Sequence, residues 1–139
     1  MTNEEKDLLL KDLCSRLPYG VMASTKLGSN IIVSFIGDDI IKGEDGDSYD
    51  ISFIKPYLRP MSSMTDDQQK EANIFDDMDI DILKENLERN HRNKTNIPTA
   101  TYNYIDWLNA HHFDYRGLIE EGLAIDAPEG MYDTKYNFD

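Results

Sequence analysis

The segment between residues 20 and 54 constrains the fold most, because short apolar runs alternate there with tight turn signals. Residues 31–36 are rich in β-branched and aromatic side chains, which is typical of a strand. Shorter runs at 21–25, 40–41 and 49–54 have a similar character, and glycine, aspartate and asparagine fill the turns between them. Four short strands joined by tight turns predict a small antiparallel β-meander with one apolar face, which another element must cover.

Residues 2–17 predict the helix that covers this face. Thr2 and Glu5 have the spacing of a capping box, in which each side chain accepts a hydrogen bond from the other residue's backbone N–H. Leucines recur every fourth residue from position 9 to position 17, and so lie on one helical face. Pro18 ends the helix, because proline disfavours helical geometry at the residue before it.

Further helices are predicted in the middle of the chain. Thr65 and Gln68 form a second capping-box pair, which predicts a helix over about 66–75. Residues 78–92 carry a thin apolar stripe and predict another helix. The composition from 90 to 101 is polar and includes a proline, so this stretch is interpreted as a flexible loop or linker.

The C-terminal part predicts two more short helices. Aromatic and aliphatic side chains over 102–108 suggest a helix with an aromatic face. Asp114 is a suitable N-cap for a second helix over 115–121, and Gly122 stands where a C-terminal glycine cap belongs. Residues 131–139 follow a proline and a glycine and are predicted to be a mobile tail.

The predicted fold is a single α+β domain over residues 1–139. In it, the small antiparallel β-meander is covered by the N-terminal helix and the C-terminal helices. A chain of 139 residues is long enough to bury such a core without disulfides or metals.

Composition excludes several classes of function. The chain has 27 Asp and Glu against 14 Lys and Arg, a formal charge of -13, which disfavours direct binding to nucleic acid or to anionic membranes. The charge would attract a basic partner, or it only keeps the protein soluble. The single cysteine, Cys14, stands among leucines, so we expect a buried structural thiol. With no secretion signal and no apolar run of about 20 residues, the predicted location is cytoplasmic.

No cofactor or metal site is predicted. The acids at positions 77, 79, 81 and 88 have the spacing of an EF-hand loop, but Ile82 stands where that loop needs glycine. His111 and His112 are adjacent, so on a helix they point about 100° apart and do not share a metal. The common phosphate-loop, dinucleotide, hydrolase and metalloprotease motifs do not occur in the sequence.

Two stretches that combine aromatic residues with arginine are candidate binding surfaces, because such residues dominate binding hot spots. One is the proline-bracketed turn from position 57 to 61, and the other runs from 107 to 116. The same side chains would also serve as the core of a small helical subdomain, and the sequence leaves both interpretations open. The candidate binding residues are Tyr57, Arg59, Trp107, His111, His112, Tyr115 and Arg116.

Three stretches carry a resemblance to known proteins: DLCSRLPYGV at 12–21, IKPYLRPMSSMT at 54–65, and DWLNAHHFDYRGLIEEGLAI at 106–125. They resemble a family of small uncharacterised proteins from bacterial prophages and related mobile elements, over about a third of the chain. The resemblance implies a genomic context and no particular chemistry.

Three hypotheses for function follow. The first is a non-enzymatic protein of a mobile element that binds a host or phage protein. The second makes the acidity functional, as a nucleic-acid mimic that inhibits a DNA-binding protein. The third is an enzyme without a recognised motif, in which His111, His112 and Asp114 supply acid–base chemistry. The sequence does not determine the oligomeric state.

Overall fold

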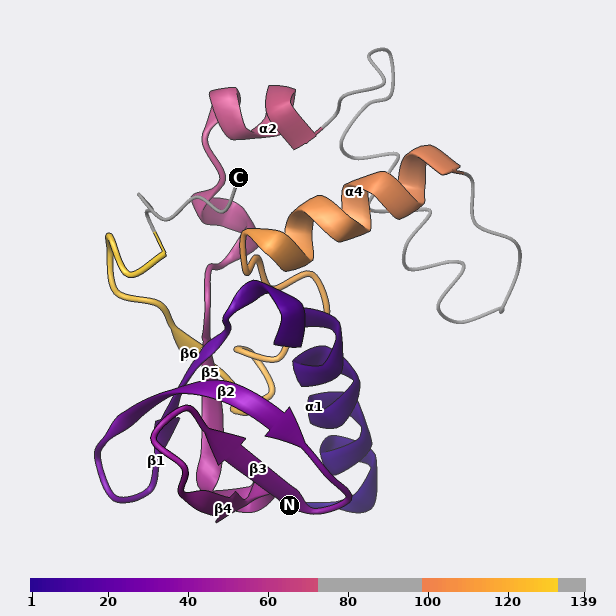
Figure 1. Cartoon of the computed structure of the whole chain (residues 1–139). Coiled ribbons are helices and arrows are strands. Elements are labelled where there is room, and N and C mark those ends of the chain that lie inside the picture. The colour runs from indigo at the N-terminus through magenta and orange to yellow at the C-terminus, as the bar shows by residue number, and fades with distance from the viewer. Residues whose placement is uncertain (73–98, 133–139) are drawn as a thin grey trace.

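The computed structural model describes residues 1–72 and 99–132 and has the predicted α+β fold (Figure 1). The described helices are α1 (Asn3–Arg16), α2 (Asp66–Ala72) and α4 (Thr99–Ala110). The described strands are β1 (Met22–Thr25), β2 (Asn30–Ile36), β3 (Ile40–Gly43), β4 (Ser48–Asp50), β5 (Ile54–Leu58) and β6 (Ile125–Asp126), which form one sheet in the order β4-β3-β2-β1-β5-β6. No helix in these two ranges is long and apolar enough to cross a membrane.

The predicted N-terminal helix is confirmed together with its cap. The Glu5 backbone N–H donates to the Thr2 hydroxyl at 3.0 Å, and the Thr2 N–H donates to the Glu5 carboxylate at 2.9 Å. The chain then forms a short 3-10 turn, Leu17–Tyr19, and Gly20 reverses direction at φ 70°. These local signals fix where α1 starts and where the chain turns back towards the sheet.

The sheet matches the predicted meander as far as β4. The interpretation of residues 49–54 as one strand is wrong, because β4 ends at Asp50 and a 3-10 turn, Ile51–Phe53, follows. The Asp50 carboxylate accepts the Ser52 N–H at 3.0 Å and stabilises this turn. The chain then crosses the sheet as β5, which pairs antiparallel with β1, while β6 pairs parallel with β5.

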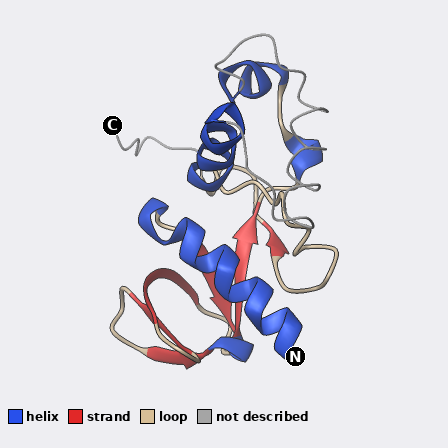
Figure 2. Cartoon of the chain, turned by 90° about the vertical axis from the view of Figure 1, so that its right-hand side faces the viewer, coloured by secondary structure: helices blue, strands red, loops and turns tan. Residues whose placement is uncertain are grey.

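Helix α1 lies across one face of the sheet, as Figure 2 shows. The interface is a cluster of buried aliphatic side chains from α1, the strands and the C-terminal loop, including Leu9, Leu13, Val33, Ile54 and Leu118. Each such side chain contributes about 1.5–3 kcal/mol when fully buried. The predicted cover of the meander by α1 is therefore the main core of the protein.

The buried stripe of α1 is rotated from the predicted one. Its buried residues are Leu9, Asp12, Leu13 and Arg16, at the i, i+3, i+4, i+7 spacing of one helical face. The prediction of a buried Cys14 is wrong, and the thiol is exposed. Two charged side chains, Asp12 and Arg16, thus lie in the interior, where they form hydrogen bonds with residues of the C-terminal part of the chain.

A second buried cluster lies where α2 and α4 meet, and contains Met64, Ala72, Tyr104, Leu108 and Phe113. Helix α4 includes the predicted helix over 102–108 and begins at Thr99, so the predicted loop over 90–101 does not extend to its last residues. The remainder of that loop, the predicted helix over 78–92 and the acids at 77–88 lie outside the described residues.

The predicted helix over 115–121 is wrong, because Gly117 adopts φ 76° and the segment forms turns. The two residues predicted as its caps, Asp114 and Gly122, nevertheless stabilise the turns. The Asp114 carboxylate accepts the Leu118 and Ile119 N–H groups, both at 2.9 Å. Gly122, at φ 74°, closes the last turn as a C-terminal glycine cap does.

Candidate binding pocket

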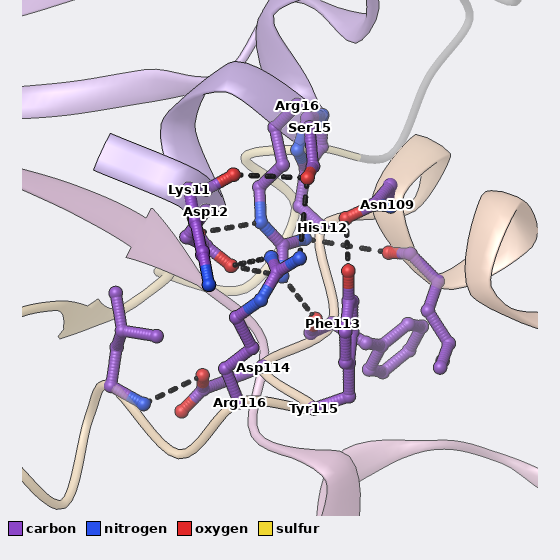
Figure 3. A network of polar contacts seen from close by, with 12 residues as sticks. Lys11, Asp12, Ser15, Arg16, Asn109, His112, Phe113, Asp114, Tyr115 and Arg116 are labelled. Carbon is purple, nitrogen blue, oxygen red and sulfur yellow. Dashed lines mark hydrogen bonds and ion pairs between the residues drawn. The ribbon is translucent and has the colours of Figure 1, made fainter. Parts of the chain in front are cut away.

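A buried ionic network joins α1 to the C-terminal end of α4 (Figure 3). The Arg16 guanidinium, fully buried, donates to the Asp12 carboxylate at 2.8 and 3.1 Å. It also donates to the backbone oxygens of Leu108 at 3.4 Å and Phe113 at 2.6 Å. The last carbonyls of a helix lack partners within the helix and attract cations, so Arg16 caps α4 from another element.

Arg116, a predicted binding residue, completes this network. Its guanidinium donates to Asp12 at 3.0 Å and to the Ser15 hydroxyl at 3.3 Å. Both guanidinium groups lie near the Tyr115 ring, whose centroid is 5.5 Å from the Arg16 guanidinium carbon and 4.8 Å from that of Arg116. Tyr115 and Arg116 therefore have structural roles. One carboxylate, Asp12, balances two cations.

His112 stands at the end of α4 in a conformation that favours glycine. Its φ is 60°, and the Phe113 N–H donates to Leu108 O while the His112 N–H donates to Asn109 O, which is the Schellman arrangement of a helix end. A non-glycine residue pays a conformational cost there. The imidazole offsets it: Nε2 donates to Tyr19 O at 3.1 Å, and the ring stacks on Tyr132 at a centroid distance of 4.0 Å.

The environment keeps the His112 ring neutral. Burial of the ring, together with the nearby positive charge of Arg16, lowers the pKa of His112 from 6.5 to about 3. A carbonyl oxygen only accepts hydrogen bonds, so the proton of the neutral ring is on Nε2, facing Tyr19. His112 is therefore suited to joining two parts of the fold, and not to exchanging protons near neutral pH.

The other members of the proposed acid–base group are also occupied. His111 stacks on Trp107 with ring centroids 4.1 Å apart, and burial lowers the pKa of His111. Both oxygens of Asp114 accept backbone N–H groups. Within residues 1–72 and 99–132, no group of three or more His, Cys, Asp or Glu side chains is placed to hold a metal ion.

A pocket of about 410 Å³ lies between residues 59–68 and residues 127–132, and the predicted binding residue Arg59 lines it. Phe113 and Tyr132 are also among its lining residues, and their ring centroids lie 5.5 and 5.8 Å from the Arg59 guanidinium carbon. The volume falls in the range of ligand sites, about 300–1,000 Å³. The pocket thus has a cation next to aromatic residues in its lining.

Backbone pairing and Tyr132 hold the two sides of this pocket in place. The Arg59 N–H donates to His112 O at 2.7 Å, and the Asp114 N–H donates to Arg59 O at 2.8 Å. On the opposite side, the Tyr132 hydroxyl accepts the Met22 N–H and donates to Tyr57 O, both at 2.8 Å. This hydroxyl sits where the β1–β5 register ends, one residue beyond the pair Ala23 and Pro56.

The structure separates the seven predicted binding residues. Arg59 lines the pocket. Tyr57 does not line it: its backbone oxygen accepts a hydrogen bond from the Tyr132 hydroxyl, and its own hydroxyl donates to Asn30. The remaining five support the pocket from the α4 side or belong to the ionic network: Trp107, His111, His112, Tyr115 and Arg116. That they contact a partner stays a prediction.

Sequence reasoning missed Tyr132, which was assigned to the tail, and the pair Asp12 and Arg16. The i, i+4 spacing of Asp12 and Arg16, in phase with Leu9 and Leu13, was the available signal for the pair. No local signal identified Tyr132.

A comparison with protein families, curated proteins and solved structures finds no match to this chain.

Proposed function

We propose that this chain is a non-enzymatic protein-interaction protein that holds its partner at the pocket around Arg59. The observation that carries the proposal is that Arg59 lies beside two aromatic rings among the lining residues of one pocket. Arginine and aromatic residues provide most of the energy of many protein interfaces.

The histidine-based enzyme hypothesis has less support. Its three residues are engaged in stacking or in backbone hydrogen bonds within the fold. General acid–base catalysis needs a group whose pKa lies near the working pH and whose proton can reach a substrate. The lowered pKa values of both histidines disfavour that role.

The proposal extends to the setting of the protein. The resemblance to small prophage proteins favours a mobile element as its source and a host or phage protein as its partner. An exposed free thiol at Cys14 fits a reducing compartment, so the proposed location is the cytoplasm.

The test is capture of partners from a host lysate by the full chain, compared between wild type and Arg59→Ser. Lys42→Ser is the matched control, because it removes one exposed cation from β3, outside the pocket lining. We expect Arg59→Ser to lose the captured protein and Lys42→Ser to retain it, with both variants folded by circular dichroism. Equal capture by all three proteins would contradict the proposal.

The nucleic-acid-mimic hypothesis predicts a different result in the same assay. A charge of -13 favours a basic partner whose binding weakens steeply as salt rises. Capture that is lost in high salt but unaffected by Arg59→Ser would favour the mimic over the pocket.

A further inference from the structure

The turn between β1 and β2 holds an exposed leucine in a fixed conformation. Leu27 is 84% exposed, more than any other large apolar side chain of the described residues. The Thr25 hydroxyl accepts the N–H groups of Leu27 and Ser29, both at 3.3 Å. The Gly28 N–H donates to Thr25 O at 3.0 Å, and Gly28 adopts φ 87°, which favours glycine. Because these bonds order the turn before a partner arrives, binding through Leu27 loses little backbone entropy.

An aromatic ring and two lysines lie beside this turn. The Lys26 N–H donates to Phe53 O at 3.0 Å and extends the pairing of β1 with β5 by one residue. The Lys26 ammonium lies 4.7 Å from the centroid of the Phe53 ring, which is 43% exposed. The preceding pair, Thr25 and Ile54, is buried in the core. Lys26 and Lys55, which follow that pair on the two strands, therefore lie on the opposite side of the sheet.

Lys26, Leu27, Phe53 and Lys55 form a small surface, the turn patch, that is positively charged in a chain whose net charge is -13. Both lysines are exposed, and within residues 1–72 and 99–132 neither forms an ion pair with a carboxylate. Lys6, by contrast, is paired with Asp39. The turn patch thus offers two ammonium groups beside exposed apolar surface, and this charge is complementary to a negatively charged partner.

The remaining surface of the protein restricts the size of such a partner. A nucleic acid or an anionic membrane presents negative charge over a wide area, and the acidic surface of this chain repels it. A short acidic segment of a polypeptide needs only the area of the turn patch. Such a segment also places a large apolar side chain among its carboxylates, which matches Leu27 and the exposed part of Phe53.

We propose that the turn patch binds a short acidic segment of a partner polypeptide that carries a large apolar side chain. The carboxylates of the segment accept hydrogen bonds from the ammonium groups of Lys26 and Lys55, and its apolar side chain packs on Leu27 and Phe53. This inference goes beyond the proposed function, because it names a second contact surface that contains none of the residues lining the pocket.

The test is titration of the isotopically labelled full chain with blocked pentapeptides, followed by NMR of the backbone amides. The acidic probe has the sequence EDFED, and QNFQN is its uncharged counterpart. EDSED keeps the charge but lacks the aromatic ring. Vesicles of phosphatidylserine with phosphatidylcholine and a ten-nucleotide oligothymidylate test the two other classes of anionic partner.

We expect EDFED to shift amides of residues 24–29 and 52–57 saturably, and less strongly as salt is raised. QNFQN should bind about threefold to tenfold more weakly, because two exposed ion pairs are lost. EDSED should also bind more weakly, since it lacks the apolar contact. The double variant Lys26→Gln and Lys55→Gln should bind EDFED and QNFQN equally, and Leu27→Ser should remove the preference for EDFED over EDSED.

Lys42→Gln is the matched control and should bind all three peptides as wild type does. Lys42 is also an exposed cation over an aromatic ring, 5.7 Å from the centroid of Phe35, but it lies on β3 outside the turn patch. Equal binding of EDFED and QNFQN to wild type, or no saturable shift with EDFED, overturns the inference. So does tighter binding of the vesicles or the oligothymidylate at the turn patch. The variants change no pocket-lining residue, so this inference and the proposed function fail separately.

Discussion

Replacing Asp12 with asparagine tests the central structural claim, that one buried carboxylate balances two guanidinium groups. Asp12 is fully buried and accepts three charge-assisted hydrogen bonds, two from Arg16 and one from Arg116. The amide keeps the shape of the side chain but removes its charge. It also places an NH₂ group where one of the carboxylate oxygens accepted, so both cations lose their counter-charge.

The expected cost follows from the burial. Each hydrogen bond to a charged group contributes about 1.5–3 kcal/mol, but three bonds to one carboxylate are not independent. Removing one partner of a buried ion pair costs about 3–5 kcal/mol, because the remaining charge stays in the interior. We therefore expect Asp12→Asn to lower the free energy of unfolding by about 3–5 kcal/mol, which is a large part of the stability of a typical domain.

Urea unfolding followed by the fluorescence of Trp107 measures this loss, since Trp107 is the sole tryptophan and packs against the second core cluster. Asp7→Asn is the matched control, because Asp7 is exposed on the same helix and should change stability by no more than about 0.5 kcal/mol. A loss below about 1 kcal/mol for Asp12→Asn would refute the claim that the carboxylate is needed in the interior.

The double variant with Arg116→Gln distinguishes an ion network from a simple packing defect. Arg116 is partly exposed, so its own substitution should cost less than that of Asp12. Once Arg116 no longer carries a charge beside Asp12, the loss of the carboxylate leaves one buried cation instead of two. The double variant should therefore lose less stability than the sum of the two single losses.

Two further predictions concern the contacts of Tyr132. Because burial lowers the pKa of His112 to about 3 in the folded state, the stability that depends on its neutral ring is fully present above about pH 6.5. It declines as the pH falls towards 3, by up to about 1.4 kcal/mol per pH unit, so the stability difference between wild type and His112→Asn should shrink in acid unfolding titrations. Tyr132→Phe keeps the ring but removes the hydroxyl that pairs with Met22 N–H and Tyr57 O. It should lower the free energy of unfolding by about 1–3 kcal/mol and speed hydrogen exchange of the Met22 amide. The control, Tyr19→Phe, changes an exposed ring and should have neither effect.

The elements that depend on local signals were predictable. The capping box at Thr2 and Glu5, the β-branched run in β2 and the glycine at position 20 each act within a few residues, and the structure has the helix, the strand and the turn that they predict. The break between β4 and β5 was missed because Asp50 caps a turn inside an apolar run. The placement of β5 beside β1 and β6 depends on pairings between distant residues, which alternation of apolar side chains does not specify.

The candidate pocket was predictable only in part, for the same physical reason. Arg59 could be predicted because arginine together with aromatic residues is typical of binding hot spots. Tyr132 follows Pro128 and Gly130, which locally favour a chain leaving the fold. Its position depends on a hydroxyl that bridges backbone groups 110 and 75 residues away. No local pattern contains that information.

The segment 107–116 illustrates how binding and support are related in this molecule. Phe113 forms part of the pocket wall, while His112 stacks behind Tyr132 and Trp107 stacks on both His111 and Phe113. A substitution such as Trp107→Ala would therefore move the wall and weaken binding without Trp107 touching a partner. Loss of binding in this segment identifies a contact residue only when the stability of the variant is unchanged, whereas Arg59 can be tested directly because its side chain lines the pocket.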